Sequence, residues 1–152
     1  MPIHINPVTL NIKELQRVIG GVLLLSQYSP LHRLYSIGEW QQRTLPSFQI
    51  NQYCYYENSQ GKPVAFFNWA FVSEKIRDEL CSGRNIIESD WQSGENIFIP
   101  EMIAPFGQVK TIVKDIRQRI FLSFKGKKIC AVRGKILKKN ENNVPKIQWF
   151  TI

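Results

Sequence analysis

The chain has 152 residues, 43% of them hydrophobic and 21% charged, with a formal net charge of +8. These values predict one ordinary globular domain, residues 1–152. They exclude a membrane-spanning helix, because the longest apolar run, around residues 18–25, is broken by two glycines and falls short of the roughly 20 residues required. The N-terminus lacks the basic region and apolar run of a signal peptide.

The first half of the chain predicts two helices and a hairpin. Apolar residues from Leu10 to Leu23 recur at intervals close to 3.6, which indicates a helix that must end at Ser29-Pro30. A second helix is expected over residues 34–42, stopped before Pro46. Residues 48–56 and 63–72 are rich in aromatic and β-branched side chains and are joined by the turn formers of ENSQGK, so we expect an antiparallel hairpin.

The second half predicts alternating helices and strands. Ser73 is expected to cap a short helix with the sequence EKIRDELC, and residues 90–96 are expected to form a polar loop. A strand over residues 97–104, a turn at Pro105-Phe106-Gly107 and a helix over residues 108–121 follow. Strands over residues 128–137 and 145–152 complete the pattern. This order predicts an α/β or α+β domain in which helices flank a mixed central sheet.

Cysteine usage points to a reducing compartment. Cys54, Cys81 and Cys130 are odd in number, widely spaced and without a CxxC pair. With only two histidines in the chain, this pattern argues against both a zinc site and a disulfide framework. We therefore predict no metal, three buried thiols and a cytoplasmic location.

Positive charge is concentrated in residues 108–139, here called the basic segment. Against one acid, Asp115, the segment holds eleven basic residues: Lys110, Lys114, Arg117, Arg119, Lys125, Lys127, Lys128, Arg133, Lys135, Lys138 and Lys139. Such a segment attracts an acidic partner, and nucleic acid, an acidic carrier protein and an acidic membrane surface all fit. A solvated basic face with no partner fits equally well.

His32 is a candidate catalytic base. It follows the rigid break at Pro30, and the hydroxyl of Ser29 lies three residues before it. An imidazole suits proton transfer because its ordinary pKa, about 6.5, lies near working pH. The alternative role is a polar residue that caps a turn. Nucleotide hydrolysis, dinucleotide binding and α/β-hydrolase chemistry have no local support, since the Walker A, GxGxxG and GxSxG motifs are missing.

Four groups of residues resemble motifs of the RTX toxin-activating lysine acyltransferases, in the family's order and at similar spacing. Ser29-Pro30-Leu31-His32-Arg33 resembles the family's SPLHR signature. The other groups are Asn51-Gln52-Tyr53 leading to Pro63-Val64-Ala65 and Asn68-Trp69-Ala70, then Asp90-Trp91-Gln92-Ser93-Gly94, and Ile103-Ala104-Pro105-Phe106-Gly107. Together they cover roughly residues 15–120.

The resemblance implies a GNAT-like acyltransferase fold, a cytoplasmic location and often a homodimer. It implies transfer of a fatty acyl chain from acyl carrier protein to internal lysines of an RTX protoxin, with no permanently bound cofactor. His32 takes the place of the family's essential histidine, and Ser29 that of its accompanying serine. Glu101, preceded by Pro100, stands where the family has a catalytic aspartate. It keeps the charge and reaches one methylene further.

Substrate contacts are predicted at two places. Asn51 lies at the mouth of a predicted strand and is a candidate substrate contact. Lys110, Lys114 and Arg117 are three to four residues apart and share one helical face, which we expect to dock the acidic carrier protein.

Two mechanisms and two rival functions remain open. The amine of the target lysine can attack the donor directly, which we favour, or an acyl-His32 or acyl-Ser29 intermediate can form first. The rivals to an enzyme are an inactive binding module of the same fold and a basic nucleic-acid-binding protein.

Overall fold

The computed structural model describes residues 3–5, 11–133 and 146–152. Its helices and strands are β1 (Ile3–Ile5), α1 (Ile12–Ser26), α2 (Ile37–Gln49), β2 (Tyr53–Glu57), β3 (Pro63–Asn68), β4 (Ala70–Val72), α3 (Glu74–Cys81), β5 (Asn96–Ile99), β6 (Met102–Ile103), α4 (Val109–Asp115), β7 (Lys128–Arg133) and β8 (Lys146–Thr151). Short 3₁₀ turns lie at His32–Leu34, Glu88–Asp90 and Leu122–Phe124, and a π-helix at Ile116–Ile120 extends α4.

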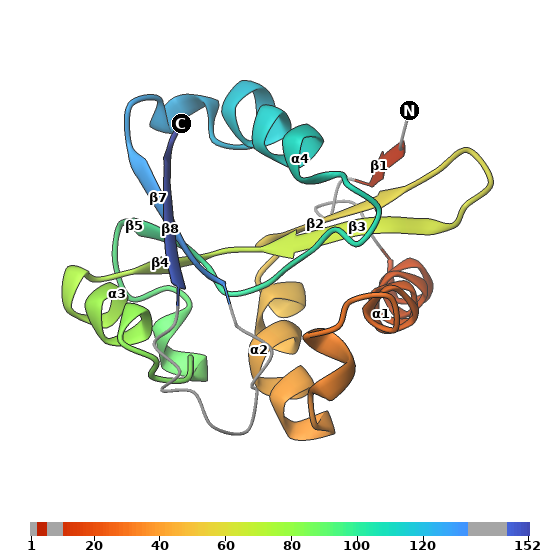
Figure 1. The fold of residues 1–152 in the computed structure, drawn as a ribbon, viewed down its shortest axis with the longest axis horizontal. Coiled ribbons are helices and arrows are strands. Elements are labelled where there is room, and N and C mark those ends of the chain that lie inside the picture. The colour runs from red at the N-terminus through yellow and green to blue at the C-terminus, as the bar shows by residue number, and fades with distance from the viewer. Residues whose placement is uncertain (1–2, 6–10, 134–145) are drawn as a thin grey trace.

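The strands form two sheets of four. One has the order β1-β2-β3-β6 and is antiparallel throughout; the other has the order β4-β5-β7-β8, in which only the β5–β7 pair is parallel. Figure 1 shows α1, α2 and α3 on one side of the sheets and α4 on the other. The predicted mixture of helices flanking strands is confirmed. The prediction of a single central sheet is wrong.

Two breaks divide the expected strands between the sheets. The predicted strand over residues 63–72 is interrupted at Trp69, whose backbone N–H donates to Gln52 O and whose carbonyl accepts from the Gln52 side-chain amide. The predicted strand over residues 97–104 is interrupted at Pro100-Glu101. Proline has no N–H to donate to a ladder, so pairing stops there and resumes at β6.

Alternating side chains on the strands divide the core between the two helical layers. On β2, Tyr53 and Tyr55 pack in a cluster with Val18 and Val22 of α1. The intervening Cys54 and Tyr56 pack in a cluster that includes Ile112 of α4 and Ile116 of the π-helix. A third cluster joins α3 to β4, β5 and β7. Because strand side chains alternate between faces, one run of apolar residues serves both layers.

The second helix starts and ends later than residues 34–42. Ser36 and Glu39 form a capping box at the start of α2, and the helix continues to Gln49 with Pro46 inside it. Proline disfavours a helix interior, but here the last turn buries Phe48 against Tyr53 and Phe66. That packing outweighs the local preference. Phe48, predicted to begin a strand, therefore belongs to the helix.

The expected polar loop over residues 90–96 is instead partly buried. Asp90 and Trp91 are 3% and 2% exposed. The N–H groups of Ser93 and Gly94 both donate to Phe71 O on β4. A Cβ at Gly94 would overlap the backbone of Val72 and Ser73, so only glycine allows this close approach. Residues 92–95 are exposed as expected, but their backbone also clamps β4.

The remaining predictions hold in part. Ser73 caps α3, as expected, by accepting from the Ile76 N–H. The helix over residues 108–121 is present as α4 followed by the π-helix. The last two strands pair antiparallel as β7 and β8, and residues 134–145 of the predicted segments lie outside the described residues. No helix in the described ranges is both long and apolar enough to cross a bilayer.

Candidate active site

His32 lies in the turn that follows α1. The helix ends at Ser26, and the Ser29 N–H donates to Ser26 O at 3.0 Å as the chain turns into the 3₁₀ segment. Pro30 prevents the helix from continuing and directs the next residues back toward the core. His32 is consequently only 5% exposed.

Both ring nitrogens of His32 have hydrogen-bond partners. The Ser29 hydroxyl lies 2.5 Å from Nδ1, and Glu101 Oε2 lies 2.6 Å from Nε2. The second carboxylate oxygen, Glu101 Oε1, accepts from the Tyr35 hydroxyl at 2.8 Å and from Arg43 Nε. The structure thus brings together Ser29, His32 and Glu101, the three predicted catalytic residues, which are separated by up to 72 positions in the sequence (101 − 29).

The backbone around Glu101 is held by Asn68. The Glu101 N–H donates to Asn68 Oδ1 at 3.0 Å, and the Asn68 N–H donates to Glu101 O at 3.1 Å. The Asn68 side-chain amide donates to Arg43 O and Ser47 Oγ, so one buried side chain links α2 to the break between β5 and β6. Arg43 also donates to the carbonyl of Pro100 at 2.9 Å. These bonds aim the longer glutamate side chain at His32.

Glu101 is ionised in this setting. Burial disfavours the charged carboxylate, but the positive charge of Arg43 and the hydrogen bond from His32 outweigh it, so the pKa of Glu101 lies below its ordinary value. Burial and the charge of Glu101 raise the pKa of Tyr35, which keeps the Tyr35 hydroxyl protonated as a donor. The hydrogen bonds that Glu101 accepts from three side chains offset the free-energy cost of burying its charge.

The ionisation of Glu101 determines the tautomer of a neutral His32. An ionised carboxylate can only accept hydrogen bonds, so Nε2 carries the proton that points at Glu101. Nδ1 then has a free lone pair, which accepts a hydrogen bond from the Ser29 hydroxyl. The unprotonated nitrogen of the imidazole therefore faces Ser29. His32 can therefore take a proton at Nδ1, on the side of Ser29, and Glu101 can stabilise the resulting imidazolium at Nε2.

Tyr35, Trp40 and Arg43 are part of the cluster, and the sequence analysis missed them. The rings of Tyr35 and Trp40 lie 5.0 and 6.1 Å from the His32 ring. A signal was present: the Ser36-x-x-Glu39 pattern marks a helix start, and Trp40 and Arg43 are then one turn apart on the same face. Nothing in the local sequence indicates that this face meets Glu101.

Among the described residues, no hydrogen bond or ion pair joins the predicted substrate-binding residues to this cluster. Asn51 is exposed and has a φ of 54°, so it forms the left-handed turn between α2 and β2, a conformation that asparagine tolerates. Lys110, Lys114 and Arg117 are all exposed on α4 and the π-helix, and Arg117 Nε donates to Thr151 O. Of the basic segment, Lys135, Lys138 and Lys139 lie outside the described residues.

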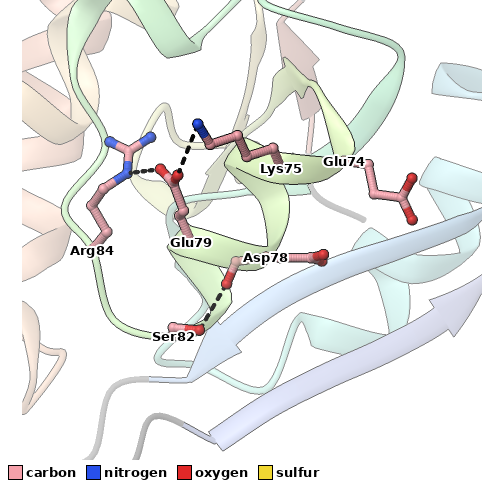
Figure 2. Close-up of a pocket in the computed structure, with 6 residues that line it drawn as sticks. All are labelled: Glu74, Lys75, Asp78, Glu79, Ser82 and Arg84. Atoms are coloured by element: carbon pink, nitrogen blue, oxygen red, sulfur yellow. Dashed lines mark hydrogen bonds and ion pairs between the residues drawn. The ribbon is translucent and has the colours of Figure 1, made fainter.

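Two other features do not offer a site. A solvent-open hollow of about 730 Å³ lies against α3, where Arg84 and Lys75 both approach the Glu79 carboxylate (Figure 2). The other two acidic residues that line it, Glu74 and Asp78, are paired with Arg77. The three cysteines are buried, as predicted, and burial raises the pKa of Cys54 to about 12, which suppresses its thiolate. In the ranges that the structure describes, no three His, Cys, Asp or Glu residues are grouped to hold a metal ion.

The scaffold and the site together define a class of protein. A buried carboxylate–imidazole–hydroxyl chain on an α/β scaffold is equipped to move protons to and from a nucleophile, as group-transfer enzymes require. The sequence matches the RTX toxin acyltransferase family model over residues 11–151. The chain belongs to the RTX toxin acyltransferase family and is an acyltransferase.

Named relatives agree with this assignment. The chain is 56% identical to the lysine-acyltransferase RtxC of Vibrio cholerae, with 100% of both chains covered. It is 31% identical to the RTX-II toxin-activating lysine-acyltransferase ApxIIC of Actinobacillus pleuropneumoniae, covering 80% of this chain and 84% of that one. It is 32% identical to the protein-lysine myristoyltransferase HlyC of Escherichia coli, covering 72% and 65%.

Proposed function

We propose that this chain transfers a fatty acyl group from acyl carrier protein to the ε-amino groups of internal lysines in an RTX protoxin. The observation that carries the proposal is the hydrogen-bonded chain of Ser29, His32 and Glu101 in a member of an acyltransferase family. We further propose a cytoplasmic homodimer with a GNAT-like fold. The parallel pair of β5 and β7, connected through α4, supports the fold assignment.

In the proposed reaction His32 is the general base. The lysine nitrogen attacks the thioester carbonyl while its proton passes to Nδ1, either directly or through the Ser29 hydroxyl that occupies Nδ1 in the free enzyme. The imidazolium is stabilised by ionised Glu101 at Nε2. The carbon–sulfur bond then breaks, and the imidazolium returns its proton to the leaving thiolate. Arg43 and Tyr35 act as positioning residues, because they hold Glu101.

A second mechanism receives support from one contact. The 2.5 Å separation between Ser29 Oγ and His32 Nδ1 is suited to removing the serine proton, which would make Ser29 the nucleophile and form an acyl-Ser29 ester. We favour direct transfer to lysine. Rapid acid quenching of enzyme mixed with acyl donor alone distinguishes the two mechanisms, since only the second leaves a labelled ester on residue 29.

The proposed docking site for acyl carrier protein is the exposed cationic face of Lys110, Lys114 and Arg117. Acyl carrier protein is acidic, and exposed cations on one surface guide such a partner by long-range attraction. The carboxylate of Asp115 is engaged by Arg119 and by Tyr56, so it does not cancel this face at close range. Asn51 remains a predicted contact for the protein substrate.

One experiment separates the proposal from its rivals. The protein is incubated with acyl carrier protein carrying labelled myristate and with a candidate RTX protoxin, and mass spectrometry locates labelled lysines. We expect transfer by the wild type and none by His32→Ala that retains the wild-type circular dichroism spectrum. An inactive binding module would label nothing in either form. Tight, salt-sensitive binding of nucleic acid without acylation would favour the nucleic-acid-binding alternative.

A further inference from the structure

The exposed face of α1 changes character along the helix. Its first half presents Lys13 and Arg17, and Arg17 pairs with Glu14 and Glu57. Its second half presents large apolar side chains: Leu23 is 55% exposed, Leu24 60%, and Tyr28, just beyond the helix, 58%. The chain from residue 18 to residue 31 contains no charged residue. Exposed apolar side chains grouped in this way mark a binding surface.

This apolar surface continues to the active site. The Tyr28 ring lies 5.2 Å from the ring of Phe106, which is 50% exposed and follows Glu101 by five residues. Tyr28 also directly precedes Ser29, whose hydroxyl bonds to His32. We call Gly20, Leu23, Leu24, Tyr28 and Phe106 the α1 surface. It ends beside the reacting group, where the acyl carbon must lie during transfer.

Gly20 supplies an independent observation. Glycine in a helix interior is destabilising relative to alanine, so an exposed one requires a reason. Its neighbour Gly21 has such a reason, because a Cβ there would overlap the hydroxyl of Tyr55. Around Gly20, a Cβ would meet no described atom within 4 Å. The intramolecular packing therefore does not require this glycine, whereas a ligand lying flat along the helix would.

We infer that the α1 surface binds the acyl chain of the donor, with the chain running from the His32 site along Tyr28 and Leu24 toward Gly20. The inference rests on the proposed acyl transfer and adds the location of the chain. A fatty chain fits because it is uncharged, long and narrow, and each methylene that it buries adds favourable transfer free energy.

Chain-length dependence tests this surface. Rates of lysine acylation are measured with hexanoyl and myristoyl acyl carrier protein for the wild type, for Leu23→Gln with Leu24→Gln, and for Gly20→Gln. Both variants should lower the ratio of the myristoyl rate to the hexanoyl rate by about tenfold. Gly20→Gln should also raise the melting temperature by about 2–4 °C, so its defect would not come from unfolding. The matched control is Lys13→Gln, about 10 Å along the same helix, which should leave the ratio as it is.

A second measurement does not require transfer. A photoreactive diazirine analogue of myristate is bound to the protein and activated, and the labelled residues are mapped after trypsin digestion. The expected label falls in the tryptic peptide of residues 18–33 and is lost in the double variant. Label confined to other peptides, or an unchanged rate ratio in both variants, would overturn the inference. Label on residues 18–33 without any acylation would support the acyl-chain site and refute the proposed transferase function.

A second copy of the chain is the main alternative occupant. If it covers the α1 surface, the wild type should sediment as a dimer and the double variant as a monomer, with myristoyl and hexanoyl rates reduced equally. That combination would also overturn the inference.

Discussion

At the scale of single residues, the chemistry depends on what surrounds one carboxylate. Glu101 is 3% exposed, yet it accepts from His32, Tyr35 and Arg43. Because Glu101 is ionised, it directs the proton of His32 to Nε2 and leaves Nδ1 facing Ser29. The extra methylene of glutamate, compared with the aspartate of the family motif, is accommodated where Pro100 interrupts the strand and Asn68 holds the backbone.

Replacing Glu101 with glutamine should impair both activity and stability. Glutamine cannot stabilise the imidazolium, so acylation should fall by about 10²-fold or more; Glu101→Asp should keep part of the rate because it keeps the charge. Leaving Arg43 without an opposite charge should cost about 3 kcal/mol of unfolding free energy at neutral pH. Denaturant unfolding of the wild type, Glu101→Gln and Glu101→Asp measures this cost. Wild-type activity in a folded Glu101→Gln variant would show that His32 does not depend on this carboxylate.

The stability cost should depend on pH in a defined direction. The pKa of Glu101 is lower in the folded state than in the unfolded chain, so its stabilising contribution is present above the ordinary glutamate pKa, about 4.3, and is lost as pH falls through the folded value. The difference between wild type and Glu101→Gln should therefore shrink in acid. Unfolding curves taken over a series of pH values test this, and a difference that grows in acid would contradict it.

Ser29→Ala distinguishes the two mechanisms by its rate. If lysine attacks directly, the variant loses a hydrogen-bond partner of Nδ1 and should retain activity reduced by about tenfold. If an acyl-Ser29 ester is obligatory, no transfer should remain. Single-turnover measurements with acyl carrier protein give the rate, and Ser29→Thr, which keeps the hydroxyl, is the matched variant.

At the scale of secondary-structure elements, the breaks in the strands create the site. β3 continues into β4 through Trp69, and β5 continues into β6 through Pro100 and Glu101, so both strands pass from one sheet to the other at neighbouring points. A regular ladder would hold Glu101 in an ordinary strand pairing. At the breaks, the N–H and the carbonyl of Glu101 both form hydrogen bonds with Asn68, and the Glu101 side chain reaches His32.

Gly94 should be essential to the clamp on β4. Gly94→Ala places a methyl group against the backbone of Val72 and Ser73, which cannot rotate away as a side chain could. We expect a loss of about 1–3 kcal/mol of unfolding free energy. Gly38→Ala is the control, since the nearest atom to its Cβ would be Ser36 Oγ at 3.9 Å. Equal unfolding midpoints for Gly94→Ala and Gly38→Ala would show that the backbone around residue 94 can shift to accommodate a methyl group at little cost in free energy.

At the scale of the whole molecule, charge and apolar surface lie on different helices. Helix α4, which carries exposed cations, lies on one side of the sheets, and α1, which carries Leu23 and Leu24, lies on the other (Figure 1). In the proposed complex, the carrier protein binds through its charge while its acyl chain is held by apolar contacts. These two contributions respond to different changes, because salt screens charges and leaves apolar burial intact.

Reversing two charges tests the docking face. Lys114→Glu with Arg117→Glu should raise the apparent KM for acyl carrier protein by about tenfold at low salt while changing kcat little, because exposed charges act on encounter rather than on the chemical step. The effect should weaken as salt rises, since the Debye length at physiological ionic strength is about 8 Å. Steady-state kinetics over a salt series measures both. An unchanged KM would place the carrier elsewhere.

The sequence by itself determined the local features. Periodicity predicted α1, runs of aromatic and β-branched residues joined by turn formers predicted the hairpin, and the clustering of charge defined the basic segment. The motif at Ser29-Pro30-Leu31-His32-Arg33 led to the correct family, and with it to His32 and Glu101 as candidates. These features could be predicted because each depends on residues close together in the chain, where spacing alone decides which side chains share a face.

Only the tertiary structure decided what meets across the fold. Cys81 and Cys130 are 49 positions apart, yet their sulfur atoms lie 2.9 Å apart as free thiols. In the same way, Arg43 and Tyr35 reach Glu101 only because α2 packs across the break between β5 and β6. Packing also extended α2 past Pro46 and divided the expected single sheet into two. Contacts of this kind depend on the free energy of burial shared by distant segments, which no local pattern encodes.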